Sequence, residues 1–255
     1  MTLKEEVRQF WDKIPCGTRE IQLEEGTKEF YAALEKDRNE KEPFISEYAR
    51  FKEQRGKSVL EIGFGAGSDF INFARHGADL TGIDLTDKGA SLVKKRLALE
   101  DLKANIHVGD AENLPFDDEK FDMAYSWGVI HHTENTPRAA QEIMRVLKPG
   151  GRVCVMLYHR YSLVSLQCWI AFALLRGKPW RTFSEVIFDH VESIGTKAYT
   201  IPEALELFSG LSSVKISTRI TPYDLRISRN KFLPNWMQIF FPDKFGWFLI
   251  IEGIK

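Results

Sequence analysis

VLEIGFGAGSDF, residues 59–70, is the stretch that decides the fold of this chain. Its apolar residues predict a buried strand over Ser58–Ile62, and the glycines that follow predict a tight turn. A helix is predicted from residue 69 to residue 76, where Gly77 ends it. A strand that runs through a glycine turn into a helix is a common binding place for nucleotide-like ligands. The sequence therefore poses the question of which ligand this turn holds.

Strand and helix patterns alternate beyond this stretch. Strands are predicted at residues 79–84, 105–108, 121–126 and 152–158, and helices at 89–100 and 138–147. A Lys-Pro-Gly-Gly turn is predicted at 148–151. This alternation predicts βαβ units, and hence a parallel sheet with right-handed crossovers. Two later strands, at 214–220 and 247–254, are predicted to form an antiparallel edge.

The fold class follows from this order of elements. We expect a single α/β domain over residues 1–255, with a doubly wound, Rossmann-like, mostly parallel sheet of seven strands and an antiparallel last strand. Residues 1–55 are mostly polar and helical, and we expect them to form a helical cap over the ligand crevice. Residues 56–158 would form the cofactor-binding core, and residues 159–255 inserted lid segments and the last two strands.

The composition, 44% hydrophobic and 28% charged, is that of an ordinary globular protein. A formal net charge of −1 gives no positive field, so no nucleic-acid partner is expected. Three scattered cysteines and a polar N-terminus indicate a cytoplasmic protein without a metal site. The apolar run at 161–175 is shorter than the roughly 18–20 residues that span a membrane. We expect no transmembrane segment and either a monomer or a homodimer. Peripheral membrane contact through the apolar segments 161–175 and 231–242 is a further possibility.

The residues around the glycines narrow the choice of ligand. A triphosphate-binding loop needs a lysine after its glycines, whereas Ser68, Asp69 and Phe70 follow here. A dinucleotide-binding GxGxxG turn is closer, but the spacing here is GxGxG, and Glu61 is a poor neighbour for a pyrophosphate. Asp84 ends the next strand, where a carboxylate can accept the hydroxyls of a ribose. That contact suits both NAD and S-adenosylmethionine, so Asp84 alone does not choose between them.

Three motifs further along the chain carry a resemblance to a known family. Residues 109–116 read GDAENLPF, residues 121–132 read FDMAYSWGVIHH, and residues 142–151 read EIMRVLKPGG. In this order and spacing they resemble the class I S-adenosylmethionine-dependent methyltransferases, and most of all the small-molecule branch of the ubiquinone and menaquinone methyltransferases. The resemblance is close over residues 59–158. It implies S-adenosylmethionine as the cofactor, S-adenosylhomocysteine as its product, and a small organic acceptor methylated on oxygen, nitrogen or carbon.

The resemblance also implies a role for each residue of the crevice. The glycines would let the backbone pass close under the methionine part of the cofactor. Asp84 would bind the ribose hydroxyls, and Asp110 would accept a hydrogen bond from the adenine amine. The residues that the resemblance assigns to the cofactor are Glu61, Gly63, Phe64, Gly65, Gly67, Asp84, Leu85, Asp110, Ala111, Glu112, Ser126 and Trp127.

The candidate catalytic residues are His131 and His132, which follow the fourth predicted strand. A base is needed only if the acceptor must lose a proton, and His132 is the first candidate, while a pocket-shaping role is the alternative for the pair. Acceptor contacts are predicted at Trp11, Tyr158, His159 and Arg160. Two other functions stay open: a membrane-peripheral methyltransferase that acts on a quinone or lipid, and a non-catalytic protein that binds S-adenosylmethionine.

Overall fold

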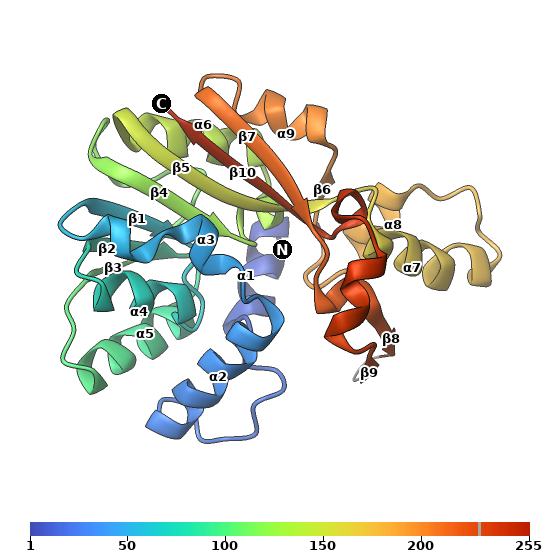
Figure 1. The fold of residues 1–255 in the computed structure, drawn as a ribbon, viewed down its shortest axis with the longest axis horizontal. Coiled ribbons are helices and arrows are strands. Elements are labelled where there is room, and N and C mark those ends of the chain that lie inside the picture. The colour runs from blue at the N-terminus through green and yellow to red at the C-terminus, as the bar shows by residue number, and fades with distance from the viewer. Residues whose placement is uncertain (229–230) are drawn as a thin grey trace.

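The computed structural model describes residues 1–228 and 231–255. Its main sheet has the strand order β3-β2-β1-β4-β5-β10-β7, and β10 alone runs in the opposite direction to the other six strands (Figure 1). The predicted doubly wound sheet with an antiparallel last strand is therefore confirmed. The bounds are β1 Ser58–Ile62, β2 Asp79–Asp84, β3 Asn105–Val108, β4 Phe121–Trp127, β5 Leu147–His159, β7 Ser212–Arg219 and β10 Phe248–Ile254. A short strand that was not predicted, β6 (Ala198–Tyr199), pairs with β5.

The crossover helices of the core are α4 (Ser68–Arg75), α5 (Asp87–Leu99) and α6 (Thr136–Val146). Both α5 and α6 begin two residues before their predicted starts. The reason lies in their N-caps, because the Thr86 side chain accepts a hydrogen bond from the Gly89 amide and the Asn135 side chain accepts one from the Arg138 amide. Capping residues, more than apolar periodicity, set where these helices begin.

The predicted turn at 148–151 is part of strand β5 in the structure. The C-terminal residue explains this difference. The Gly150 amide donates to the Lys255 carbonyl over 2.9 Å, and the Lys255 amide donates to the Gly151 carbonyl over 3.0 Å. The end of the chain thus supplies ladder partners that cannot be identified from the local Pro-Gly-Gly signal.

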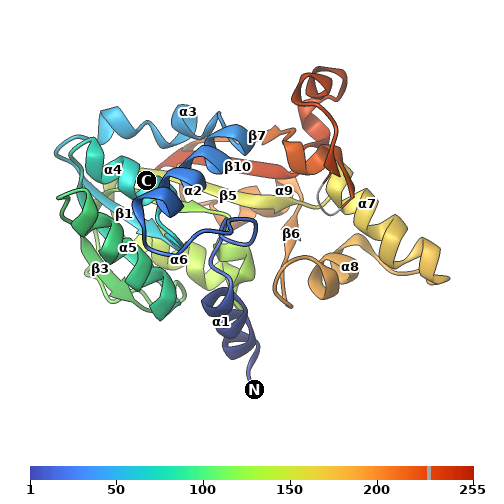
Figure 2. The same ribbon diagram turned by 90° about the horizontal axis from the view of Figure 1, so that it is seen from below.

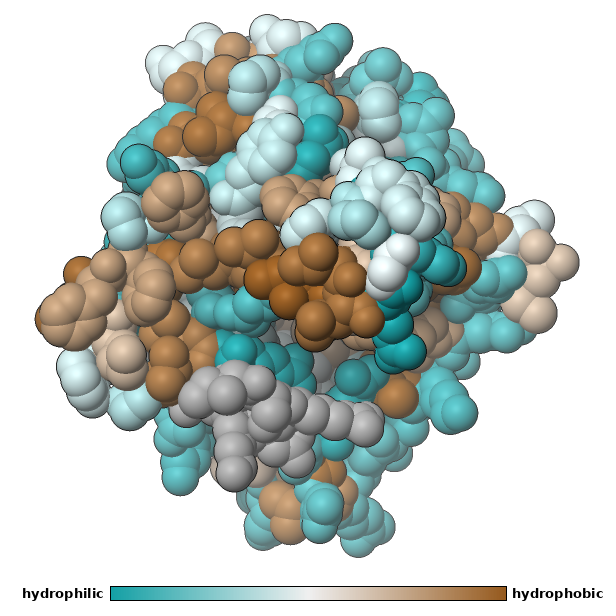
Figure 3. Space-filling model, turned by 90° about the vertical axis from the view of Figure 1, so that its right-hand side faces the viewer, coloured by the Kyte–Doolittle hydropathy of each residue, from teal (hydrophilic) through white to brown (hydrophobic). Residues whose placement is uncertain are grey.

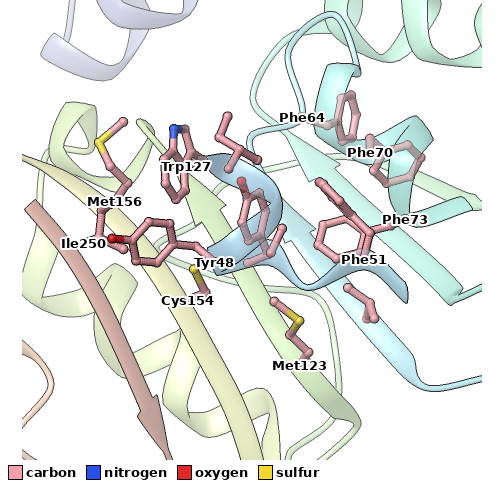
Figure 4. Packing of buried hydrophobic residues seen from close by; sticks show 14 of the residues in the cluster. Tyr48, Phe51, Phe64, Phe70, Phe73, Met123, Trp127, Cys154, Met156 and Ile250 are labelled. Carbon is pink, nitrogen blue, oxygen red and sulfur yellow. The ribbon is translucent and has the colours of Figure 1, made fainter. Parts of the chain in front are cut away.

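The cap consists of α1 (Leu3–Lys13), α2 (Lys28–Lys41), α3 (Ile45–Ala49) and the 3-10 helix η1 (Phe51–Gln54). Aromatic side chains fasten α3 and η1 to the sheet (Figure 4). Phe51 packs edge-on against Phe73 of α4 with ring centroids 4.7 Å apart, and Tyr48 lies 6.0 Å from Trp127 of β4. This contact buries apolar surface on one face of the sheet and holds the cap beside the carboxyl end of β4.

The lid segments lie at one end of the molecule, opposite α5 (Figures 1 and 2). The first part contains α7 (Leu163–Phe172), η3 (Leu174–Arg176) and α8 (Phe183–His190), and it returns to the sheet through β6. Helix α9 (Ile201–Leu207) then leads into β7. The second part lies between β7 and β10 and contains η4 (Pro222–Leu225), β8 (Arg226–Ser228), β9 (Lys231–Phe232), η5 (Asn235–Phe240) and η6 (Asp243–Phe245).

Candidate active site

A cleft of about 1400 Å³, counted together with its opening to solvent, lies where β1, β2 and β4 end. Loops after these strands form one wall, and the cap forms the other. This is the crevice at the carboxyl ends of the strands where open α/β sheets bind ligands. Eleven of the twelve predicted cofactor residues line it: Glu61, Gly63, Phe64, Gly65, Gly67, Asp84, Leu85, Asp110, Ala111, Glu112 and Trp127. The twelfth, Ser126, is buried outside the lining.

The turn after β1 has a backbone that requires glycine. Gly63, Gly65 and Gly67 all have positive φ, at 77°, 50° and 84°. A Cβ atom on Gly63 would lie 2.3 Å from a methyl carbon of Val129, which is a severe overlap. At the three glycines the turn therefore presents only backbone to whatever the cleft binds.

Asp84 fixes this turn from the end of β2. Its carboxylate accepts hydrogen bonds from the Gly65 amide over 2.8 Å, the Thr86 amide over 2.9 Å and the Thr86 hydroxyl over 2.7 Å. Burial raises the pKa of Asp84 above its ordinary value, and the Thr86 and Gly65 hydrogen bonds oppose that rise. Because a carboxylate accepts about four hydrogen bonds, roughly one position remains for a ligand hydroxyl.

Glu61 is a buried carboxylate that lines the cleft. Its Oε2 atom has no hydrogen-bond partner among the described residues. Burial, followed by the nearby Asp69 carboxylate, raises the pKa of Glu61 well above its usual range. An unpaired buried acceptor is costly unless a ligand satisfies it. A ligand that carries an ammonium group beside a glycine turn meets that need, and the methionine part of S-adenosylmethionine carries one.

A buried ionic network from the cap closes the same part of the cleft. Arg38 of α2 donates to Asp69 of α4 and to Glu42, each over 2.7 Å. Tyr125 donates to the same Asp69 over 2.9 Å, and Trp127 donates to Glu42 over 2.7 Å. Sequence reasoning missed Arg38, Glu42 and Asp69, because a charged helix residue ordinarily indicates a solvated face.

Asp110 lies at the far end of the cleft, after β3. Its carboxylate accepts a hydrogen bond from the Glu112 amide over 2.9 Å and pairs with Lys4 of α1, whose Nζ lies 2.5 Å from Oδ2. Lys4 also lies 3.5 Å from a carboxylate oxygen of Glu112. The first cap helix is thus tied by charge to the position where an adenine amine is expected.

The two histidines lie in different surroundings. His132 lines the cleft, and Trp11 of α1 packs edge-on against it with centroids 5.2 Å apart. His131 is fully buried outside the lining and packs on the Tyr158 ring at 4.0 Å. Burial lowers the pKa of His131 well below its usual range, which keeps its imidazole neutral. The structure therefore brings only His132 of the pair to the cleft.

The four predicted acceptor residues are not brought together. Trp11 lines the cleft, whereas Tyr158, His159 and Arg160 do not. The Arg160 guanidinium pairs with Glu203 at 2.8 Å and donates to the Ala198 carbonyl, so its charge is already neutralised. Tyr223 and Cys16, from the lid and the cap loop, line the cleft instead, and no local motif marks either of them.

Residues 1–228 and 231–255 contain neither a cluster of metal-ligating side chains nor a membrane-spanning helix. No group of three or more histidine, cysteine, aspartate or glutamate side chains is arranged to hold a metal ion. No helix in that part is both long and apolar enough to cross a membrane.

Comparison with known proteins yields one family and several relatives. A family described as a methyltransferase domain matches residues 60–155. The phthiotriol/phenolphthiotriol dimycocerosates methyltransferase of Mycobacterium leprae (strain TN) is 42% identical over 100 residues, which are 38% of this chain and 36% of that protein. The demethylmenaquinone methyltransferase of Clavibacter sepedonicus is 35% identical over 102 residues, which are 39% of this chain and 40% of that protein. The match thus spans less than half the length of these relatives.

The fold as a whole also has solved counterparts. The structure of an S-adenosylmethionine-dependent methyltransferase from Thermotoga maritima, described as a possible histamine N-methyltransferase, aligns with a TM-score of 0.58. The alignment covers 98% of this chain and 99% of that chain at 19% sequence identity. At this identity the likeness shows the fold alone.

Proposed function

We propose that this chain, in which residues 60–155 form a class I S-adenosylmethionine-dependent methyltransferase domain, transfers the methyl group of that cofactor to a small organic acceptor. The observation that carries the proposal is the unpaired, buried Glu61 carboxylate beside the glycine turn that Asp84 fixes. An acidic group in that position favours a ligand with an ammonium group over one with a pyrophosphate.

The cleft residues suggest how the cofactor is held. Glu61 would accept from its ammonium group, and Arg38 would face its carboxylate. Asp84 has room for one ribose hydroxyl, and Asp110 would accept from the adenine amine in place of part of its contact with Lys4. When bound, the cofactor supplies an electrophilic methyl group. The chain itself contributes orientation and the exclusion of water.

Direct tests of the proposal are titration calorimetry with S-adenosylmethionine and S-adenosylhomocysteine, and a transfer screen with methyl-labelled cofactor over metabolite pools. We expect binding of both compounds and label in at least one acceptor. The absence of binding would overturn the proposal. Binding without transfer to any acceptor would favour a protein that binds the cofactor without turnover.

His132 is proposed as the base for acceptors that lose a proton. His132→Gln is expected to lower kcat about 100-fold, because a positioned base typically contributes at least that factor. Cofactor affinity by calorimetry is expected to change less than twofold. His107→Gln, at an exposed position of β3, is the matched control. Full activity of His132→Gln would show that another group acts as the base, or that holding the acceptor close to the cofactor is sufficient for transfer.

The lid favours a second candidate for the acceptor, a quinone or lipid taken from a membrane surface. Apolar side chains gather on this end of the molecule (Figure 3). Among them Leu175 and Trp180 are each 75% exposed and Ile239 is 80% exposed. We call the set the apolar lid face; its described members are Leu166, Ile170, Leu174, Leu175, Trp180, Trp236, Ile239 and Phe240.

The charge of the apolar lid face suits contact with a bilayer, and its position brings it close to the cleft. The exposed Arg176 and Lys178 lie within it, and neither forms an ion pair inside the described part of the chain, which suits anionic lipid head groups. Gln167 of α7 donates to the Asp224 carbonyl over 2.8 Å, next to Tyr223 of the cleft lining. An acceptor that leaves the bilayer at this face would therefore lie close to the cleft.

Flotation with vesicles that contain anionic phosphatidylglycerol tests this candidate. We expect the protein to float with the vesicles, and Leu175→Ser/Trp180→Ser to weaken binding about tenfold or more, since each side chain loses burial in the interface. Leu205→Ser, at an exposed position on α9, is the matched control. If the protein does not float, the acceptor is not drawn from a lipid surface.

A further inference from the structure

The loop between α8 and β6 holds His132 from the lid side. The hydroxyl oxygens of Ser193 and Thr196 lie 3.1 Å and 3.0 Å from Nδ1 of His132. The Lys197 amide donates to the His131 carbonyl over 3.0 Å, which fastens the end of the loop to the same turn. Two buried hydroxyl groups from one loop thus contact the imidazole ring of His132, and a backbone hydrogen bond fixes the loop beside it.

The hydrogen bonds determine which ring nitrogen carries the proton. The Thr196 hydroxyl donates its single hydrogen to the Ser193 carbonyl over 2.7 Å. Towards His132 the same oxygen can therefore only accept, so its contact with Nδ1 is a hydrogen bond when Nδ1 is the donor, and the Ser193 hydroxyl can accept from the same N–H. In the neutral ring the lone pair then lies on Nε2, the nitrogen able to take up a proton.

Nε2 of His132 is buried and has no hydrogen bond to any described residue. A carboxylate oxygen of Glu192 nevertheless lies 3.3 Å from it, off the line that a hydrogen bond would need. The Tyr158 hydroxyl donates to that same oxygen over 2.8 Å and holds it in place. Nε2 therefore has an unused hydrogen-bonding position, and a negative charge lies beside it.

The backbone at Glu192 supports a specific role for this residue. Its φ is +55°, a left-handed conformation that costs a residue with a long side chain about 1 kcal/mol or more. Strain of this kind persists where the surroundings enforce it, and here it directs a carboxylate towards His132.

We propose that Glu192, Ser193 and Thr196 are positioning residues that make Nε2 of His132 the proton acceptor of the transfer step, an inference that rests on the proposed function. The acceptor loses its proton to Nε2 while its reacting atom bonds to the methyl carbon. The electron pair of the broken carbon–sulfur bond stays on sulfur, and the imidazolium later releases the proton to water. Glu192 stabilises that imidazolium without touching the acceptor.

The other groups beside His132 are either neutral near neutral pH or have their charge directed away from its ring. Burial lowers the pKa of His131 well below its usual range and raises the pKa of Tyr158 well above it, so both are neutral. Helix α1 presents Trp11, which does not titrate, and Lys197 turns its ammonium to the Thr133 carbonyl. The Glu192 carboxylate is thus the negative charge that faces Nε2 of this ring.

Kinetics of Glu192→Gln test the role of the charge. The amide retains an oxygen that can accept from Tyr158, yet the imidazolium loses its anionic neighbour. We expect kcat to fall about tenfold to a hundredfold, with KM and cofactor affinity unchanged and the acidic limb of the kcat–pH profile moved to lower pH. Glu192→Asp should restore the limb, and Glu206→Gln, an exposed glutamate on α9, is the matched control. An unmoved acidic limb would overturn the role of Glu192.

Nitrogen-15 NMR of histidine-labelled protein without cofactor tests the hydrogen-bond assignment independently of activity. Neutral His132 is expected to carry its proton on Nδ1 in the wild type, and Thr196→Val should shift the population towards the Nε2-protonated form. A wild-type ring protonated on Nε2 would overturn this inference and leave the proposed function standing. A wild-type protein that fails to bind S-adenosylmethionine would instead overturn the proposed function.

Discussion

Asp84→Ala is expected to weaken S-adenosylmethionine binding by about 100-fold or more. The substitution removes the acceptor for a ribose hydroxyl and, at the same time, the carboxylate that holds the Gly65 amide in the glycine turn. Hydrogen bonds to a charged group contribute about 1.5–3 kcal/mol each, and 100-fold corresponds to about 2.7 kcal/mol. Titration calorimetry of the variant and the wild type measures the difference.

Asp79→Ala is the control for this experiment. Asp79 lies at the exposed start of the same strand, β2, away from the cleft lining. We expect it to bind the cofactor as the wild type does. Asp84→Asn keeps the side-chain volume and one acceptor oxygen. Its affinity for the cofactor should therefore lie between that of Asp84→Ala and that of the wild type. If Asp84→Ala binds with wild-type affinity, the ribose assignment is wrong.

Arg38→Met is expected to lower the free energy of unfolding by about 3–5 kcal/mol, the usual cost of removing one partner of a buried ion pair. The variant keeps the volume of the side chain but leaves Glu42 and Asp69 without their cation. Urea denaturation followed by circular dichroism measures the loss. Cofactor binding should weaken as well, because Arg38 lines the cleft.

The loss of unfolding free energy in Arg38→Met should increase as the pH rises. Burial already raises the pKa of Glu42 and of Glu61 in the folded protein, so the folded state binds these protons more readily than the unfolded state. Stability from such groups is present at low pH and falls as the pH rises through the folded pKa. Without Arg38 both carboxylates lose a nearby positive charge, so the variant should be closest to the wild type near pH 5 and furthest from it near pH 8.

Lys36→Met separates this effect from a general loss of helix charge. Lys36 lies on the same helix, and its side chain is 77% exposed. The expected change in the free energy of unfolding is within about 0.5 kcal/mol, as for most surface substitutions. Equal destabilisation by the two variants would refute the importance of the buried network.

The sequence was sufficient to predict the core of the sheet and the wall of the cleft that the strand ends form. The bounds of β1, β2 and β3 match their predictions. Strands β1 and β2 are buried, and such strands between polar turns have a short and distinctive apolar pattern, whereas β3 is a largely exposed edge strand. The glycine turn, Asp84 and Asp110 follow strand ends directly. Parallel strands bring their carboxyl ends to one edge of the sheet. The residues that follow these strands therefore lie close together, independently of how the rest of the chain folds.

Only the tertiary structure determines which side chains of the cap and the lid lie at the opposite side of the cleft. Arg38, which lines the cleft, comes from a cap helix and pairs with Asp69 of α4. Glu192 comes from a lid loop and lies beside His132 of the cleft lining. His131 and His132 are neighbours in sequence, yet one is buried beneath the sheet end and the other faces the cleft. Local patterns report whether a segment is a helix or a strand and which face is apolar. Long-range packing determines which polar side chain contacts which partner. The periodicity of the sequence does not predict these contacts.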